Sequence, residues 1–429
     1  MIMAADKQDK VLNFSSEREQ SGACSSSAER EKNQGKNFLN VPNLRFPEFK
    51  DEWDKDRVRN LFTMNVGGDI DKANVSSIQT DEFKYPVIAN ALSNDGIYGY
   101  TSEYKDDCPS ITVTGRGDVG LAKYRDYPLF PIVRLLVLHS KGKIDCRFGV
   151  HAINCIKKYE ESTGVPQLTA PQLGAYSISF PNLTEQAKIG AFLKLIDERI
   201  STQIRIIEDL KSERKYLLEQ LFCLPNERVP KLRLKGMTGE WQKVKLCYIA
   251  NRVTEKNKAN TCNRVLTIAA QYGLIDQQEF FNKQIASSDL TTYYLLHKGD
   301  FAYNKSYSGD YSWGAVKRLD KYDKGVLSSL YICFRPNENV DSDFLCHYFE
   351  STKWYRGISE ISGEGARNHG LLNMSVDDYF NTLHRIPSVE EQRQISSVLN
   401  TTTQKIEIEV SILDRLQQQK KYLLSTMFI

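Results

Sequence analysis

The chain has 429 residues, of which 41% are hydrophobic and 26% charged, an ordinary globular composition that allows two or three domains. Its formal net charge is only +3, so no overall field attracts an acidic partner, and any nucleic-acid surface would need local clusters of lysine and arginine. No apolar run approaches the length of a membrane span, and nine cysteines without a C-x-x-C pair exclude a disulfide framework and favour a cytoplasmic protein.

The chain begins with a segment of low hydrophobicity. Residues 1–38 are polar and nearly free of large apolar side chains after Phe14, which predicts a disordered tail. Residues 39–183 are then expected to form a first globular domain. Cys146, His151 and Cys155 within it lack a fourth ligand at suitable spacing, so no metal site is expected.

A glycine motif interrupts this first domain. The stretch SITVTGRGDVGLAKYRDYP at 110–128 places Gly115, Gly117 and Gly120 in the spacing G-x-G-x-x-G after a β-type run, where a dinucleotide site would lie. Pro128 follows too soon for a full crossover helix, which disfavours that reading. A strand followed by a flexible loop remains.

Basic and aromatic side chains surround this loop, and they are candidates for contacts with DNA. Arginine and lysine bind phosphates, arginine also reads guanine, and glycine lets the backbone approach a partner closely. The alternative is a glycine-rich turn with solvated charges. Residues 85–100 form a second candidate patch, which is equally compatible with a simple turn. The candidates in this domain are Asn90, Arg116, Lys123, Tyr124 and Arg125.

Two long segments, 184–222 and 388–429, have apolar residues spaced alternately three and four apart, which predicts long helices with a coiled-coil seam. Each follows a proline and carries a Thr or Ser and a Glu in its first turn, as helix starts do. Some 38 residues would make a rod of roughly 57 Å. The predicted seam comprises Ile196, Ile200, Ile207, Leu210, Arg214, Leu217, Ile406, Glu409, Leu413, Leu416 and Leu423.

Between these helices, residues 223–387 are expected to form a second domain. A β-type run at 301–303 leads into another polar loop, and a further patch follows at 363–370. Asparagine can read adenine, and tyrosines can position phosphates, so this loop has different chemistry from the first. The candidates here are Asn304, Lys305, Tyr307, Lys317, Arg318 and Arg367.

The chain contains two copies of one sequence unit. VPNLRFPEFKDEW at 41–53 recurs as VPKLRLKGMTGEW at 229–241 with an offset of 188, and 164–186 matches 370–392 with an offset of 206. The two helices would then pair antiparallel about a pseudo-two-fold axis. In that register Arg214 faces Glu409 and Gln203 faces Lys420, unless these polar ends extend to solvent.

These repeated motifs resemble those of the specificity subunits of bacterial type I restriction-modification enzymes. The resemblance rests on V-P-x-L-R at the start of each domain, Glu-Gln at the start of each helix and K-Y-L-L near its end, and it covers nearly all of residues 41–429. It implies an α+β fold with two pseudo-symmetric target-recognition domains separated by two long helices that form an antiparallel coiled coil.

The resemblance also implies partners and a division of labour. Each domain would read one half of a bipartite double-stranded DNA target, while the helices set the distance between the halves. Modification (methyltransferase) subunits would dock on the helices, and restriction (translocase and endonuclease) subunits would complete the complex. S-adenosylmethionine, ATP and Mg are expected on those partners, with no cofactor or metal bound by this chain and no membrane association.

Three other functions compete with this one. Intrinsic catalysis is disfavoured, because no Pro-Pro dipeptide, no G-x-x-x-x-G-K-[ST] phosphate loop and no H-E-x-x-H or G-x-S-x-G motif occurs. A coiled-coil scaffold would not need two large domains with divergent loops. A DNA-binding protein outside a restriction system remains an alternative.

Overall fold

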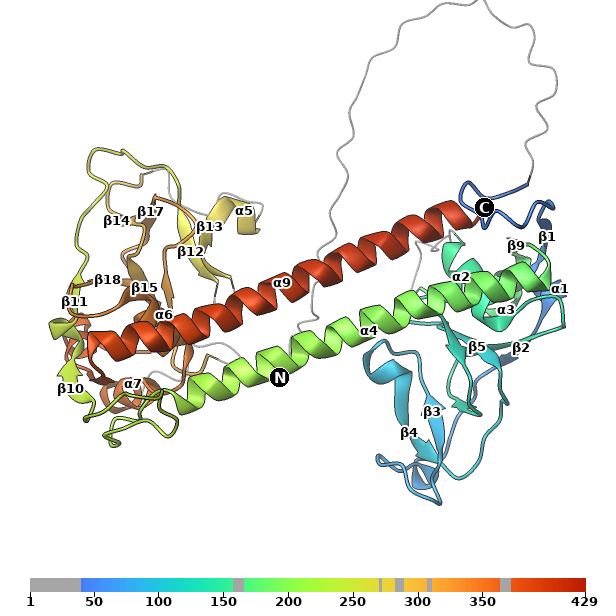
Figure 1. The fold of residues 1–429 in the computed structure, drawn as a ribbon, viewed down its shortest axis with the longest axis horizontal. Coiled ribbons are helices and arrows are strands. Elements are labelled where there is room, and N and C mark those ends of the chain that lie inside the picture. Colours follow the sequence, from blue (N-terminus) through green and yellow to red (C-terminus); the bar gives the residue numbers. More distant parts are fainter. Residues whose placement is uncertain (1–39, 157–165, 270–271, 282–288, 307–310, 363–371) are drawn as a thin grey trace, which may run out of the picture.

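The computed structural model describes residues 40–156, 166–269, 272–281, 289–306, 311–362 and 372–429. Two domains of mixed helix and strand lie at opposite ends of two long antiparallel helices, which run side by side between them (Figure 1). The predicted α+β class, the two domains and the antiparallel helix pair are therefore confirmed. The predicted tail at 1–38 lies outside the described residues.

The rod consists of α4 (Leu183–Gln220) and α9 (Val389–Met427), which contain 38 and 39 residues. Each begins at a polar side chain that accepts a hydrogen bond from the backbone three residues on. Asn182 accepts from the N–H of Glu185 at 3.0 Å, and Ser388 accepts from the N–H of Glu391 at 3.3 Å. The helices start within a residue of the predicted positions.

The first domain precedes α4. Its elements are β1 (Asp54–Arg57), α1 (Val58–Leu61), β2 (Phe62–Val66), η1 (Lys72–Asn74), β3 (Tyr85–Ile88), η2 (Ser93–Gly96), β4 (Ile97–Thr101), β5 (Ser110–Val113), β6 (Ala122–Arg125), β7 (Phe130–Pro131), β8 (Leu136–Ser140), α2 (Cys146–Cys155), α3 (Ala170–Ala175) and β9 (Ser177–Phe180). A four-stranded antiparallel sheet has the order β2-β8-β5-β6, a three-stranded sheet has the order β4-β3-β7, and β1 pairs with β9. The three-stranded sheet lies beyond the four-stranded one, away from the rod (Figure 1).

The second domain lies between α4 and α9. Its elements are β10 (Gln242–Lys245), η3 (Leu246–Tyr248), β11 (Ala250–Arg252), β12 (Leu266–Ala269), β13 (Gly273–Asp276), α5 (Gln277–Phe281), β14 (Tyr294–His297), β15 (Phe301–Asn304), β16 (Ala315–Arg318), β17 (Lys324–Leu327), β18 (Ile332–Pro336), α6 (Ser342–Glu350), α7 (Tyr355–Ile361), α8 (Val376–Phe380) and β19 (Leu383–Ile386). Its four-stranded sheet has the order β11-β18-β15-β16, and the pairs β10-β19, β12-β13 and β14-β17 surround it.

The two domains repeat the same frame. Asp54 pairs with Phe180 where β1 meets β9, and the matching pair in β10 and β19 is Gln242 with Ile386. These partners differ by the two offsets found in the sequence, and the two four-stranded sheets have the same strand arrangement. The outer strands differ, because β3, β4 and β7 form one sheet while their counterparts form two separate pairs.

The repeated sequence motifs meet in space. Arg45 of the first V-P-x-L-R motif donates two hydrogen bonds of 2.7 Å to the carboxylate of Glu185, which is completely buried at the start of α4. Arg233 makes the same bidentate contact with Glu391 at 3.0 and 2.8 Å. Charge-assisted pairs of this geometry are among the strong hydrogen bonds of proteins. Each motif therefore fastens its domain to the start of one long helix.

Each domain also holds the end of the other helix. The N–H of Leu44 donates to the carbonyl of Thr426 at the end of α9, and Leu232 donates likewise to Gln220 at the end of α4. Phe428 then stacks on Phe148 in the core of the first domain, with ring centroids 5.2 Å apart. Both domains therefore contact both helices, so each domain is anchored to the rod at two points.

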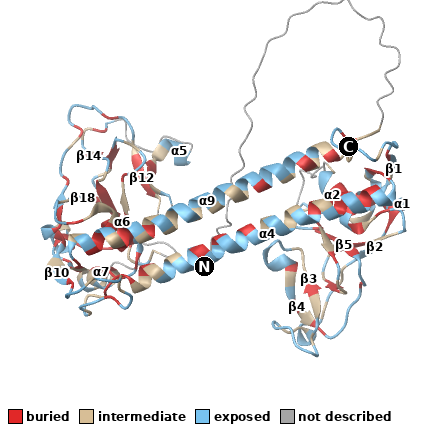
Figure 2. Cartoon of the chain, in the orientation of Figure 1, coloured by how far each residue is buried: buried red, intermediate tan, exposed pale blue. Residues whose placement is uncertain are grey.

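Buried and partly buried positions recur among exposed ones along both long helices (Figure 2). Ile207, Leu210, Leu416 and Leu423 are buried, whereas the other predicted seam side chains are partly buried: Ile196, Ile200, Arg214, Leu217, Ile406, Glu409 and Leu413. Burial along one stripe is the pattern expected of helices that pack through a seam.

The predicted register of the polar seam residues is wrong. Gln203 donates to the carbonyl oxygen and the carboxylate of Glu409, at 3.0 and 2.6 Å, and does not meet Lys420. Arg214 donates to Thr403 at 2.9 Å and pairs with Glu350 of α6 in place of Glu409. The observed partners on α9 precede the predicted ones in the chain, Glu409 in place of Lys420 and Thr403 in place of Glu409. Of the observed acceptors, Glu409 and Thr403 belong to α9, whereas Glu350 belongs to the second domain, which symmetry between the helices alone does not include.

Candidate DNA-recognition surfaces

The glycine motif of the first domain forms the turn between β5 and β6, which pair antiparallel. A Cβ on Gly115 would lie 2.3 Å from the carbonyl oxygen of Arg134 and 3.0 Å from that of Leu168, so only glycine fits there. Gly117 and Gly120 have φ angles of 70° and 85°, which glycine adopts without strain. The motif therefore builds a tight hairpin and not the parallel strand-helix-strand unit of a dinucleotide site.

The predicted candidate Asn90 anchors the base of this hairpin. Its Oδ1 accepts a hydrogen bond from the N–H of Gly115 at 2.7 Å, and its Nδ2 donates to the carbonyl of Val133 at 2.7 Å. Both ends of the amide are thus engaged within the protein, so Asn90 acts as a scaffold residue. Arg116 lies at the exposed tip and makes no hydrogen bond with the described part of the chain.

Lys123 and Arg125 converge on Asp95. The Nζ of Lys123 lies 2.9 Å from one carboxylate oxygen, and Arg125 pairs with the other while also donating to the Asp95 carbonyl at 3.0 Å. Burial opposes ionisation of Asp95, yet the two cations outweigh it and hold the pKa of this carboxyl below its usual value. Arg125 is only 2% exposed, so its position favours a structural role over the predicted DNA contact.

Tyr124 lies beneath Arg147, whose guanidinium carbon is 5.1 Å from the ring centroid. Both side chains border a cavity of about 560 Å³ between the first domain and the rod, which is also lined by Lys123 and Lys194. Burial lowers the pKa of His151 in the same wall to about 4, so its imidazole is neutral at pH 7.

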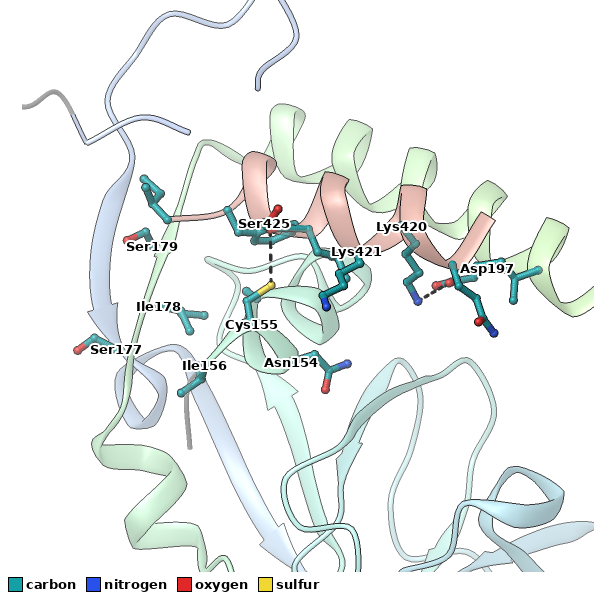
Figure 3. Close-up of a pocket in the computed structure, with 16 residues that line it drawn as sticks. Asn154, Cys155, Ile156, Ser177, Ile178, Ser179, Asp197, Lys420, Lys421 and Ser425 are labelled. Atoms are coloured by element: carbon teal, nitrogen blue, oxygen red, sulfur yellow. Dashed lines mark hydrogen bonds and ion pairs between the residues drawn. The ribbon is translucent and has the colours of Figure 1, made fainter. Parts of the chain in front are cut away.

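A second cavity, of about 890 Å³, lies between α2, β9 and the end of α9 (Figure 3). Lys420 pairs with Asp197 across one end of it, and the thiol of Cys155 approaches the carbonyl of Leu424 at 3.9 Å. No group of three or more histidine, cysteine or acidic side chains that could hold a metal ion occurs among the described residues. The cavity is therefore lined by residues of the first domain and of both long helices.

The second domain presents the corresponding hairpin, between β15 and β16. The side chain of Asn304 accepts from the N–H of Ser306 at 2.9 Å, and the carbonyl of Lys305 accepts from Leu372 at 3.0 Å. The latter bond matches one in the first domain, where the carbonyl of Gly115 accepts from Leu168 at 3.0 Å. The two domains therefore brace their hairpins in the same way.

The two remaining described candidates of the second domain lie on β16. The Nζ of Lys317 lies 6.0 Å from the ring centroid of Tyr311. Arg318 pairs with Asp320 and with Asp343 of α6, both at 2.6 Å, so it joins the strand to the helix beside the rod. Its position favours a structural role, like that of Arg125.

Two predicted candidates, Tyr307 and Arg367, lie outside the described residues. The structure places Arg116, Lys123, Tyr124 and Arg125 on one hairpin with Asn90 at its base, and it places Asn304, Lys317 and Arg318 on the strands of the other hairpin. Sequence reasoning missed Asp95, which binds two predicted cations from a turn about 30 residues away in the chain. No local pattern marks a pairing over that separation.

None of the helices in the described part of the chain is both long and apolar enough to cross a membrane. The main surface features of the described chain are the two hairpins and the rod between them.

Comparison with known proteins gives these features a context. Residues 50–212 match the type I restriction modification DNA specificity domain. Two Mycoplasma pneumoniae proteins named as type I specificity subunits are 30% identical over 152 residues and 34% identical over 128 residues. The matches cover 34% and 30% of this chain, and 42% and 38% of the relatives, so the chain matches less than half the length of either.

A solved structure shares the whole fold. The specificity (S) subunit of a type I restriction-modification system from M. genitalium matches with a TM-score of 0.56 at 17% identity, and the match covers 91% of this chain and 99% of that one. Both domains and both long helices therefore have counterparts in one protein. The shared fold, the matched domain and the two relatives therefore agree that this chain is similar to type I restriction-modification specificity subunits.

Proposed function

We propose that this chain is the DNA-specificity subunit of a type I restriction-modification complex, in which each domain reads one half of a bipartite double-stranded target. The carrying observation is that two equivalent domains, fixed at opposite ends of one rod, present corresponding hairpins with different side chains. Two domains with the same strand arrangement but different hairpin side chains are suited to reading two different half-sites. Base-edge contacts supply specificity, while phosphate contacts fix orientation.

The dimensions of the rod support this assignment. Helices of 38 and 39 residues extend about 57 Å, whereas one turn of B-DNA rises about 34 Å. Domains held at the two ends can therefore reach separate stretches of major groove. Because both domains form hydrogen bonds with both helices, the gap between the half-sites is set by helix length and not by a flexible linker.

The chemistry is assigned to partners, with this chain as a non-catalytic member of the complex. Modification subunits would supply S-adenosylmethionine-dependent adenine methylation, and restriction subunits would supply ATP- and Mg-dependent translocation and cleavage in the cytoplasm. Apolar side chains on the outer face of the rod support docking of such subunits, because Leu195 is 64% exposed and Ile408 is 60% exposed. Neither residue contributes to the seam.

The test is a genome-wide map of methylated adenines in a bacterial strain that expresses this chain together with the modification subunit from the chain's native organism. A two-part motif that disappears when this chain is deleted is the expected result. Lys421→Ala, at an exposed lysine of α9 that lies on neither hairpin, serves as the matched control and should keep the motif. If the complex assembles and the methyltransferase is active but no two-part motif depends on the chain, the proposal fails.

A further inference from the structure

Four segments that are distant in the sequence converge around Gly115 at the base of the first hairpin. Asn90 binds its N–H, Leu168 donates to its carbonyl, and the carbonyl of Arg134 packs against the position where a side chain would begin. The hairpin that carries Arg116 and the turn that carries Arg134 are thus in direct backbone contact. The partly buried Arg134 therefore lies at the base of the hairpin whose tip carries the exposed Arg116.

The backbone of Arg134 is unusual. Its φ is +67°, a left-handed conformation that residues other than glycine, asparagine and aspartate seldom adopt. The turn is held in place because Arg134 donates its N–H to the carbonyl of Gly67 at 3.2 Å and Val133 donates to Gly68 at 3.0 Å. Such conformations persist only where the surroundings hold them, and they concentrate at functional sites. Glycine would adopt this φ angle with less strain than arginine does. The presence of arginine here therefore points to a role for its side chain.

The side chain of Arg134 retains most of its donors. One Nη1 hydrogen bond of 2.8 Å goes to the Oε1 of exposed Gln167, and its Nε and Nη2 groups make none with the described residues. Arg125 differs, because Nε, Nη1 and Nη2 all have partners inside the protein. A guanidinium steadied on one nitrogen with two others available can form the paired hydrogen bonds by which arginine reads guanine.

We propose that Arg134 is a specificity-determining residue of the first domain, which reads a guanine in the same half-site as Arg116. Gln167 is its positioning residue, because it orients the guanidinium without needing to touch DNA. This inference rests on the proposed function and names a residue that neither the charge pattern nor the glycine motif of the sequence indicated.

The test compares variants of the full chain, expressed with the modification subunit, by mapping methylated adenines and by measuring Tm. Arg134→Gly removes the side chain but accepts the left-handed backbone, so Tm should stay level or rise. Arg134→Lys keeps the charge and loses the fork that binds guanine. Both should lower discrimination for one base of one half-site by roughly 5- to 150-fold, with the other half-site unchanged.

Two further variants complete the design. Gln167→Ala should lower the same discrimination by a smaller factor, since the guanidinium remains but is less ordered. Arg57→Lys, at an exposed arginine on β1, is the matched control and should leave both half-sites and Tm unchanged.

The outcomes separate this inference from the proposed function. If the wild-type chain directs a two-part motif that both Arg134 variants preserve, the inference is overturned while the function stands. If Arg134→Gly lowers Tm and weakens both half-sites equally, Arg134 is structural and the inference is overturned again. If the wild-type chain directs no two-part motif, the proposed function fails and this inference fails with it.

Discussion

The buried pair between Arg45 and Glu185 offers the sharpest test of how the domains are fastened to the rod. Glu185 has no exposed surface, and Arg45 approaches both of its oxygens at 2.7 Å. The change Glu185→Gln keeps the shape but removes the negative charge, and it replaces one acceptor oxygen with a donor that faces the guanidinium.

The expected loss follows from burial. Removing one partner of a buried ion pair costs about 3 to 5 kcal/mol, because the other charge is left without compensation. Glutamine still offers one acceptor, and Arg45 lies near the surface, so a value near 3 kcal/mol is expected. For a domain of 150 to 250 residues this corresponds to a Tm lower by about 6 to 12 °C.

Calorimetry measures the effect, and hydrogen exchange in β1 and β10 assigns each transition to its domain, since unfolding of a two-domain chain is not two-state. The first domain should melt earlier, with the second unmoved. Glu391→Gln should produce the converse. Glu198→Gln is the matched control, because Glu198 is 56% exposed and its ion pair within the described ranges is with Lys194 on the same helix. The reasoning is refuted if Glu185→Gln is as mild as this control.

Three further predictions concern the register, a buried histidine and the hairpin. Arg214→Glu should lower the free energy of unfolding by about 2 to 4 kcal/mol, and adding Glu350→Arg should recover part of the loss whereas adding Glu409→Arg should not, as measured in double-mutant cycles. Burial lowers the pKa of His384 to about 4, below its unfolded value of about 6.5. The free energy of unfolding should therefore rise by about 3 kcal/mol as pH increases between these two values, and urea titrations of His384→Gln should lack this pH dependence. Gly115→Ala should destabilise the first domain by more than about 2 kcal/mol in thermal melts, because the alanine Cβ would lie 2.3 Å from the carbonyl oxygen of Arg134. The same change should abolish recognition of one half-site only. An unchanged Tm would contradict the packing described above.

Features that repeat along the chain were predictable from sequence. The seam follows from a heptad spacing that is local to each helix, and the V-P-x-L-R and Glu-Gln motifs were found because they occur twice. Their physical reason, the contact between Arg45 and Glu185, appeared only in the structure, because 140 residues separate the two partners.

Features that depend on long-range partners were not predictable. Arg125 and Arg318 look like free basic residues in the sequence, yet Asp95 and Asp343 hold them within the protein. The conformation of Arg134 leaves no trace in composition or spacing, because it is imposed by the turn that packs on Gly67 and Gly68. Sequence patterns therefore located the hairpins better than they identified which side chains are available to DNA.

The central claim is that two domains read two half-sites across a spacer of fixed length, and lengthening the rod tests it most directly. One heptad inserted at matching positions of α4 and α9 adds about 10 Å and preserves the phase of the seam. Methylated-adenine mapping should then show the same two half-site sequences with a gap longer by about three base pairs at 3.4 Å per base pair. An unchanged gap, or altered letters within the half-sites, in a complex that still assembles would contradict the account.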